Sequence, residues 1–158
     1  MQALLLRAPY ERIADRLAAL APDLDVVVLE PDGGLTLRGA PFDPSALRPD
    51  IWWLSLEAFG KRGGDYFPRL AASPDARWVQ TAFAGLDNPM FKPLARDGLT
   101  VTNSSAQAPA IAEYVTIHAL SLLHPIAEQA ARQRAHDWTP VNFRQVGQTR
   151  WLIVGFGN

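Results

Sequence analysis

The sequence contains no cysteine, which excludes disulfides, cysteine-based zinc sites and thiol nucleophiles at once. It also lacks an excess of either charge, since 15 Lys and Arg face 16 Asp and Glu and the formal net charge is -1. A chain this close to neutral has no electrostatic attraction for nucleic acid or for an anionic membrane. We therefore expect neither as a partner, and the absence of cysteine fits a reducing compartment.

Long hydrophobic runs are missing as well. The apolar start at residues 1–6 is ended by Arg7, too early for a signal sequence or a membrane span. The apolar stretch at residues 108–123 contains Glu113 and His118 and is shorter than the ~20 residues that a span needs. The default expectation is a cytoplasmic protein, and an apolar share of 48% allows a sizeable core.

Short apolar runs alternate with helical patterns along most of the chain. Five strands are predicted, at residues 3–6, 25–29, 51–54, 77–81 and 99–102. Helices are predicted at residues 10–21, 66–72, 89–97, 109–124 and 126–136, the fourth of them apolar nearly all round and therefore buried. Residues 31–50 are interpreted as a loop with a short β-ribbon at 35–37 and a single turn at 44–47. The order predicts an α/β fold with a parallel, doubly wound sheet of flavodoxin-like type.

The last eight residues have a different character. Residues 151–154 are apolar and are followed at once by Gly155-Phe156-Gly157. A buried strand leading into Gly-x-Gly is how a dinucleotide-binding βαβ unit begins. The third glycine, the phosphate-binding helix and the acidic residue further on are not among these 158 residues. We therefore expect the chain to be the front part of a two-part enzyme.

Ligands of open parallel sheets bind beyond the carboxyl ends of the strands. On the predicted strands, four segments lie there: residues 7–8, 55–56, 81–85 and 103–105. The segment 81–85 is the most informative, because its small residues and Gly85 leave backbone N–H groups open to an anion such as a carboxylate. The alternative is a turn that needs glycine for its φ angle.

Other polar residues give weaker indications. Asn103 is either part of an Asx turn or a hinge between two domains. Glu113 is interpreted as a carboxylate near the positive end of its helix. His118 and His124 do not have the i, i+4 spacing of a metal pair, so core or interface positions are expected, and His136 is assigned to a surface loop. The residues predict no metal site.

Four separated segments agree with one family. Residues 78–87, 98–103, 112–115 and 154–157 together resemble the D-isomer-specific 2-hydroxyacid dehydrogenases. The resemblance implies a two-domain oxidoreductase that transfers a hydride between NAD or NADP and a small D-2-hydroxy acid or 2-oxo acid. It implies a flavodoxin-like substrate (lid) domain at residues 1–102. Residues 103–158 would be the hinge, connecting helices and first strand of a truncated Rossmann domain for NAD.

The resemblance also implies roles for particular residues. Asn103 would lie at the first hinge between the domains. The substrate carboxylate would be bound at Phe83, Ala84 and Gly85, by backbone amides of Ala84 and Gly85. Gly155 and Gly157 would belong to the loop that binds the cofactor phosphates. The family is expected to form homo-oligomers such as a dimer.

The family's catalytic arginine, acidic residue and histidine have no match in this sequence, and none of Arg7, Arg77, Arg132 or the three histidines takes their place. We therefore assign no catalytic residue, and we expect the chain alone neither to bind NAD or NADP tightly nor to turn over substrate. The alternative function is a non-catalytic, flavodoxin-like binding or interaction module. A reading frame that continues past Asn158 with these residues would decide for the dehydrogenase.

Overall fold

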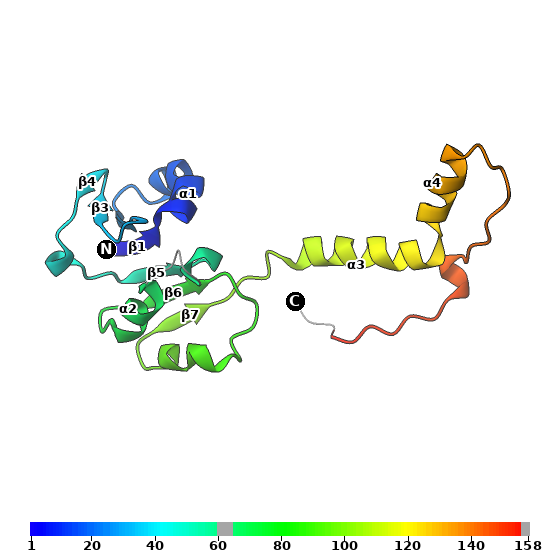
Figure 1. Ribbon diagram of the computed structural model, residues 1–158. Coiled ribbons are helices and arrows are strands. Elements are labelled where there is room, and N and C mark those ends of the chain that lie inside the picture. The colour runs from blue at the N-terminus through cyan, green and yellow to red at the C-terminus, as the bar shows by residue number, and fades with distance from the viewer. Residues whose placement is uncertain (60–64, 156–158) are drawn as a thin grey trace. The chain divides into compact units, whose positions relative to one another are not determined.

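The computed structural model describes residues 1–59 and 65–155 (Figure 1). The chain divides into two compact units, Met1–Ser104 and Ser105–Asn158, which we call the sheet unit and the helical unit. The boundary predicted between residues 102 and 103 lies close to this division.

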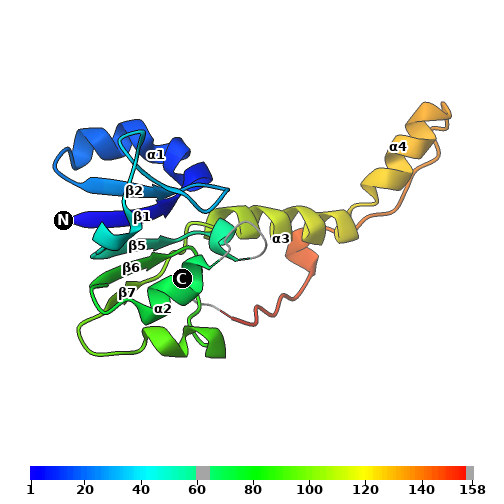
Figure 2. The ribbon, with the colours of Figure 1, turned by 60° about the vertical axis from the view of Figure 1, so that its left-hand side comes forward.

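The sheet unit is built on seven strands in the order β4-β3-β2-β1-β5-β6-β7, and Figure 2 shows the strands of its parallel part side by side. The strands are β1 (Gln2–Leu6), β2 (Asp25–Leu29), β3 (Leu35–Leu37), β4 (Ala40–Pro41), β5 (Ile51–Leu54), β6 (Trp78–Thr81) and β7 (Thr100–Thr102). β3 and β4 form an antiparallel ribbon at one edge, and the other strands are parallel. When the five parallel strands are numbered along the chain, their order across the sheet is 2-1-3-4-5, the flavodoxin-like arrangement. The α/β class is confirmed, and the ribbon makes the sheet mixed.

Burial explains why these apolar runs are strands. Leu4 of β1 is paired with Val27 of β2 and Trp52 of β5, and all three side chains are at most 1% exposed. Parallel strands carry unbroken apolar runs because both faces of the sheet are covered. At about 1.5–3 kcal/mol for each large apolar side chain, this burial is the main term that stabilises the sheet unit.

The first helix begins earlier than the sequence predicts. α1 (Arg7–Leu20) follows β1 directly, so Pro9 lies in its first turn and not before the helix. The first N–H groups of a helix have no partner inside it, and a proline there removes no helical hydrogen bond. The prediction for α2 (Tyr66–Ala72) is confirmed, and short 3-10 helices lie at η1 (Pro44–Ala46) and η2 (Leu56–Ala58).

The segment before β7 is a 3-10 helix, η3 (Pro89–Leu94), shorter than the predicted helix at residues 89–97. Asn88 caps it, with Oδ1 accepting a hydrogen bond from Met90 N at 3.0 Å. Pro93 lies inside the helix and has no N–H to continue it. Gly98 then turns the chain with a φ of +78°.

A buried aromatic pair ties α2 to the sheet. The rings of Trp52 and Tyr66 meet edge to face at 5.3 Å. The Tyr66 hydroxyl donates to the carbonyl oxygens of Leu4 at 2.6 Å and Trp53 at 3.0 Å, and burial raises the pKa of this hydroxyl. Tyr66 therefore fixes α2 against β1 and β5 by packing and by hydrogen bonds.

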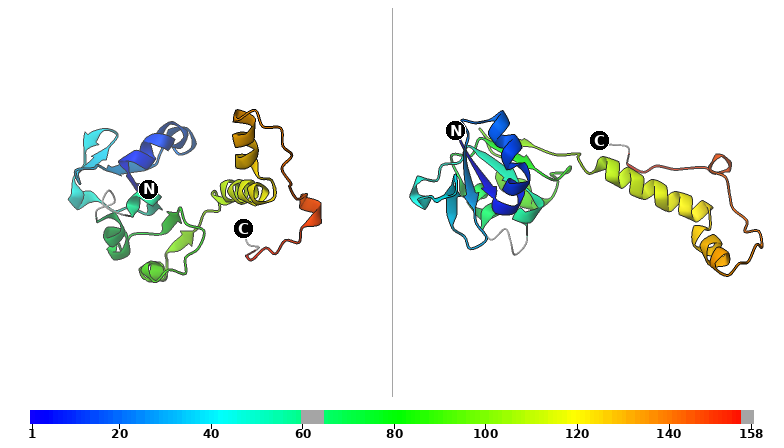
Figure 3. Two further views of the ribbon diagram at one scale, coloured as in Figure 1. Left: turned by 45° about the vertical axis from the view of Figure 1, so that its right-hand side comes forward. Right: turned by 90° about the horizontal axis from the view of Figure 1, so that it is seen from above.

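The helical unit contains α3 (Ala108–Leu123), α4 (Ile126–Arg134) and the 3-10 helix η4 (Val146–Gln148). α3 and α4 meet at a bend of 62° (Figure 3). Neither helix has a buried side chain, so the prediction that α3 is buried is wrong for this chain. The physical reason is that no surface in the described part of this unit covers the apolar residues of α3.

The strand predicted at residues 151–154 is also not formed. Leu152, Ile153 and Val154 are 89%, 66% and 89% exposed, and the segment pairs with no other strand among the described residues. A strand needs a neighbour to satisfy its backbone N–H and C=O groups, and the described residues of the helical unit provide none.

Among the described residues, no single helix has the length and hydropathy of a membrane span. α3 and α4 reach that threshold only when they are counted together across their bend.

Candidate functional site

The topology brings the predicted ligand-binding segments to one edge of the sheet. Because β1, β5, β6 and β7 are parallel neighbours, their carboxyl ends lie at the same edge. The segments at residues 7–8, 55–56, 81–85 and 103–104 follow these strands in that order. The strand order reverses between β1 and β5, which is the position where open α/β sheets form a binding crevice.

The loop after β6 is held in place through its carbonyl groups. The Phe83 carbonyl accepts a hydrogen bond from Ser104 N at 3.1 Å, and the Ala84 carbonyl accepts one from Asn103 Nδ2 at 2.7 Å. At the start of the loop, Ala82 N donates to the Leu54 carbonyl and Phe83 N donates to Thr81 Oγ1, both at 3.1 Å. The first part of the loop is therefore tied to β5 and β6, and the second part to the end of β7.

These bonds set the direction of two backbone donors. In a trans peptide the C=O and N–H groups point in opposite directions. The carbonyls of Phe83 and Ala84 point toward residues 103–104, so the N–H groups of Ala84 and Gly85 point away from them. Neither N–H has a hydrogen-bond partner in the described part of the chain, and both residues are exposed. Consecutive N–H groups on one side form a concave site for anions, which we call the donor pair.

Glycine at position 85 is not required by a left-handed backbone. Four described glycines have a positive φ, and Gly85 is not among them. The alternative prediction, a turn that needs glycine for its φ angle, is therefore wrong. Instead, a Cβ on Gly85 would lie 2.9 Å from Asp87 Oδ1, so glycine at this position avoids a close contact with the Asp87 carboxylate.

The ring of Phe83 packs inward. It lies 4.9 Å from the Phe59 ring and 5.8 Å from the Phe91 ring, and Phe67 completes a cluster of four phenylalanines. Phe83 is half-buried, so its ring anchors the loop to the phenylalanine cluster. The main chain, and not the phenyl ring, is thus the part of residues 83–85 that can meet a polar ligand.

Two ion pairs engage charged side chains near the carboxyl ends of the strands, and the first joins the ends of β1 and β2. Arg7 donates Nε to Glu30 Oε2 at 2.9 Å, and Thr36 donates its hydroxyl to Glu30 Oε1 at 2.6 Å. The hydrogen bonds from Arg7 first, and then from Thr36, lower the pKa of Glu30 to about 2. Glu30 is therefore ionised at neutral pH, where it cannot donate a proton and is only a weak base.

The second pair joins α1 to the end of β5. Arg12 Nη2 lies 2.5 Å from Glu57 Oε1, and this hydrogen bond is the main cause that lowers the pKa of Glu57. The nearby Ser55 hydroxyl is buried and has no hydrogen-bond partner among the described residues. Arg7 and Arg12 both face carboxylates, so neither is free to hold a substrate anion.

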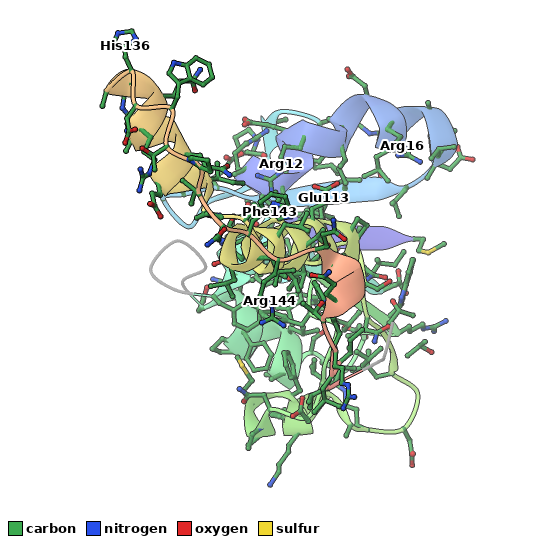
Figure 4. The ribbon with its side chains drawn as sticks, turned by 90° about the vertical axis from the view of Figure 1, so that its right-hand side faces the viewer. Arg12, Arg16, Glu113, His136, Phe143 and Arg144 are labelled. Carbon is green, nitrogen blue, oxygen red and sulfur yellow. The ribbon has the colours of Figure 1, made fainter. Side chains whose placement is uncertain are left out.

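The titratable residues of the helical unit do not converge on a site. The His118 ring contacts Tyr114 edge to face at 4.1 Å, and the His124 ring stacks on Phe143 at 4.8 Å. His136 lies beyond α4, as Figure 4 shows, and has a φ of +55°. Glu113 is exposed on α3. Among the residues that the structure describes, no group of three or more His, Asp and Glu side chains could hold a metal.

Only the first residue of the predicted cofactor loop, Gly155, is among the described residues. Gly155 has a φ of +86°, the left-handed backbone that favours glycine in a tight turn. Gly157 lies outside the described residues.

Sequence reasoning missed Gln80. Its side-chain amide lies between the ends of β6 and β7 and donates to the carbonyls of Thr81 at 2.9 Å and Asn103 at 3.1 Å. The available signal was a long polar side chain inside an apolar strand. That signal does not show which distant carbonyl groups the amide reaches.

Of the comparisons with known proteins, only the one with solved structures found a similar fold. No protein-family model and no curated protein matches the chain. Among solved structures it is similar to a D-isomer specific 2-hydroxyacid dehydrogenase from Xanthobacter autotrophicus Py2 in complex with NADPH and MES, with a TM-score of 0.54 and 22% identity. The chain shares the fold of the matched part of that dehydrogenase. It is also similar to a phosphoglycerate dehydrogenase from Lactobacillus plantarum, with a TM-score of 0.40 and 20% identity.

The two similarities cover very different shares of this chain and of the dehydrogenases. They cover 91% and 92% of this chain, but only 43% of each dehydrogenase. The chain therefore spans less than half the length of the proteins that it resembles.

Proposed function

We propose that this chain supplies the substrate-carboxylate-binding domain, and the first part of the cofactor domain, of an NAD(P)-dependent oxidoreductase acting on small D-2-hydroxy or 2-oxo acids. The observation that carries the proposal is the donor pair at Ala84 and Gly85, at the carboxyl edge of a flavodoxin-like sheet. The fold shared with a 2-hydroxyacid dehydrogenase supports it. So does the resemblance of residues 78–87 and 98–103 to the same family.

In the proposed chemistry, the residues of this chain bind and orient the substrate carboxylate, and they are not assigned to the transfer of the hydride or the proton. The carboxylate of the acid accepts hydrogen bonds from the two N–H groups, which are strong because the acceptor is charged. This contact orients C2 and its hydroxyl relative to the sheet edge. Oxidation moves a hydride from C2 to a nicotinamide and the hydroxyl proton to a base. No residue of this sequence is assigned as that base, so the chain's own part is binding and orientation.

For the cofactor we propose contacts from Gly155 and Gly157 to the pyrophosphate. The left-handed φ of Gly155 fits the first glycine of such a loop. The fit is partial, because residues 151–154 are not paired in a sheet that would hold the loop in place. We therefore expect NAD and NADP to bind this chain weakly.

The direct test is a titration of the 158-residue chain, labelled with ¹⁵N, with oxalate, glyoxylate and D-lactate. We expect the amide signals of Ala84 and Gly85 to shift most, and Gly85→Pro, which deletes one donor, to weaken binding. Chloride at the same ionic strength is the control. Separate titrations with NADH and NADPH should show no micromolar binding, and an assay with glyoxylate should show no turnover.

Each outcome bears on the proposal. Carboxylate shifts that avoid residues 82–85 would contradict the assigned site and favour a binding module of another kind. Micromolar NADH binding or reduction of glyoxylate by the purified chain would contradict the proposed division between binding and catalysis.

We also propose that the chain self-associates. Ile117 and Leu122 of α3 are 61% and 88% exposed, and the prediction of a homo-oligomer draws support from this apolar surface. Sedimentation velocity over a hundredfold range of concentration tests it. A monomer throughout that range, with α3 still helical, would contradict self-association.

A further inference from the structure

The donor pair depends on residues that lie outside its own loop. We infer that Asn103 is a positioning residue for the donor pair and that Gln80 holds Asn103 in place. The role of the donor pair as a carboxylate site rests on the proposed function. The positioning itself does not, because it concerns only hydrogen bonds within the sheet unit.

Asn103 acts on one particular peptide group. Its Nδ2 donates to the Ala84 carbonyl at 2.7 Å, and that carbonyl shares a planar peptide with Gly85 N–H. Fixing the oxygen therefore fixes the direction of the hydrogen on the opposite side. The main chain of Ser104 does the same for the neighbouring peptide, through its hydrogen bond to the Phe83 carbonyl at 3.1 Å. A side chain thus orients one donor, and the backbone orients the other.

Gln80 fixes the segment that carries Asn103. Its Nε2 donates to the carbonyl of Asn103 at 3.1 Å and to that of Thr81 at 2.9 Å. Its Oε1 accepts from the Thr102 hydroxyl at 2.6 Å, and that hydroxyl accepts from Trp78 Nε1 at 2.8 Å. Both ends of the Gln80 amide are therefore engaged, and the network joins the carboxyl ends of β6 and β7. The network thereby connects the loop at residues 81–85, which carries the donor pair, to residues 102–103, which orient it.

The arrangement assigns Asn103 an indirect role. Its amide donor is directed at a main-chain oxygen of the loop, so its effect on a ligand passes through the Ala84–Gly85 peptide. Asn103 is also next to the last residue of the sheet unit, where the chain leaves for the helical unit. Any change at this exit that moves Asn103 therefore changes the aim of one donor.

Three substitutions test the positioning role and separate it from an effect of charge. Asn103→Ala removes the donor, and Asn103→Asp keeps the size but places carboxylate oxygens beside the Ala84 carbonyl. Gln80→Glu does the same to the carbonyls of Thr81 and Asn103. The matched control is Asn88→Asp, which adds the same charge near the same loop. An aspartate at position 88 still accepts the cap hydrogen bond that Asn88 accepts from Met90 N.

The first measurement needs no ligand: ¹⁵N relaxation of the full chain and each variant. We expect order parameters at Ala84 and Gly85 of about 0.85 in the unaltered chain and the control, and below about 0.6 in both Asn103 variants. The second measurement is the oxalate titration, in which the Asn103 variants should bind about fivefold more weakly, the effect of one hydrogen bond. Gln80→Glu should also weaken the binding of oxalate.

The outcomes distinguish the two proposals. If the Asn103 variants keep a rigid loop and an oxalate affinity within twofold of the unaltered chain, the positioning role is wrong. If the loop loosens in these variants but oxalate shifts no amide in the unaltered chain, positioning stands and the carboxylate site fails. A loss of the same size in Asn88→Asp would show an effect of charge alone and would also overturn the role of Asn103.

Discussion

The sheet unit and the helical unit contain apolar residues in regular secondary structure, yet only one of them has a core. Leu54 of β5 is fully buried, whereas Leu122 of α3 is 88% exposed. Secondary structure and residue type are comparable in kind, so the difference comes from whether another apolar surface is present. A parallel sheet supplies such surfaces within the sheet unit, because its strands and helices cover one another.

Polar contacts differ in the same way. In the sheet unit they join distant segments, as in the contacts of Arg7 with Glu30 and of Gln80 with Asn103. In the helical unit the ion pairs are local, as between Arg132 and its neighbours Glu128 and Asp137. The comparison indicates that tertiary stability is concentrated in residues 1–104.

The largest expected effect on the free energy of unfolding comes from comparing the same Leu→Ala truncation in the two units. Leu54→Ala removes a fully buried side chain and should lower the free energy of unfolding by about 2–5 kcal/mol. At concentrations where the chain is a monomer, Leu122→Ala removes an exposed side chain and should change the free energy of unfolding by less than about 0.5 kcal/mol. Urea unfolding followed by tryptophan fluorescence measures both. Equal losses would show that α3 has a packed partner and would break the comparison.

A smaller effect is expected from Glu30 and should depend on pH. The folded-state pKa of Glu30, about 2, is lower than its ordinary value of 4.5, so the contribution is complete above pH 4.5 and is lost as the pH falls toward 2. Because both partners are partly exposed, we expect roughly 1 kcal/mol. Glu30→Gln should remove this part of the pH dependence, as thermal unfolding between pH 2 and 6 would show.

The control for this experiment comes from the helical unit. Glu128→Gln breaks an exposed pair with Arg132 and should leave the pH dependence unchanged. If Glu30→Gln also leaves it unchanged, then the Arg7–Glu30 pair does not distinguish the two units.

The smallest effect concerns two glycines. Gly98 has a φ of +78°, so Gly98→Ala should destabilise the chain by about 1 kcal/mol although no atom lies within 4 Å of the added Cβ. Gly147 in η4 also has open space and no left-handed φ. Gly147→Ala should therefore be neutral or stabilising by a few tenths of a kcal/mol. Differential scanning calorimetry on both variants measures the contrast, and equal effects would contradict the role of φ.

Local sequence patterns were sufficient to predict the bounds of an element where its apolar pattern matches its burial in the fold. The predicted bounds of β2, β5 and α2 match the structure because each is an unbroken apolar run or a short amphipathic one between clear breaks. The start of α1 was misplaced because Pro9 acts as a breaker only inside a helix, and not in its first turn. η3 was predicted too long because Pro93 interrupts it.

The candidate site was predictable only in part. The sequence indicated the loop at residues 81–85 and the position of Asn103, because both follow strands. It did not indicate that the Phe83 ring turns inward, or that Asn103 and Gln80 orient the loop, because these contacts join residues about 20 positions apart.

The sequence by itself determined the parallel strands of the sheet unit, the α/β class and the location of the candidate ligand-binding edge, since apolar periodicity and chain order are local properties. Tertiary structure alone decided the direction of the donor pair, because the peptides of residues 83–85 are held by hydrogen bonds from the next strand's end. It also decided the fate of the apolar residues in α3 and at residues 151–154, since burial requires a second surface as well as an apolar side chain.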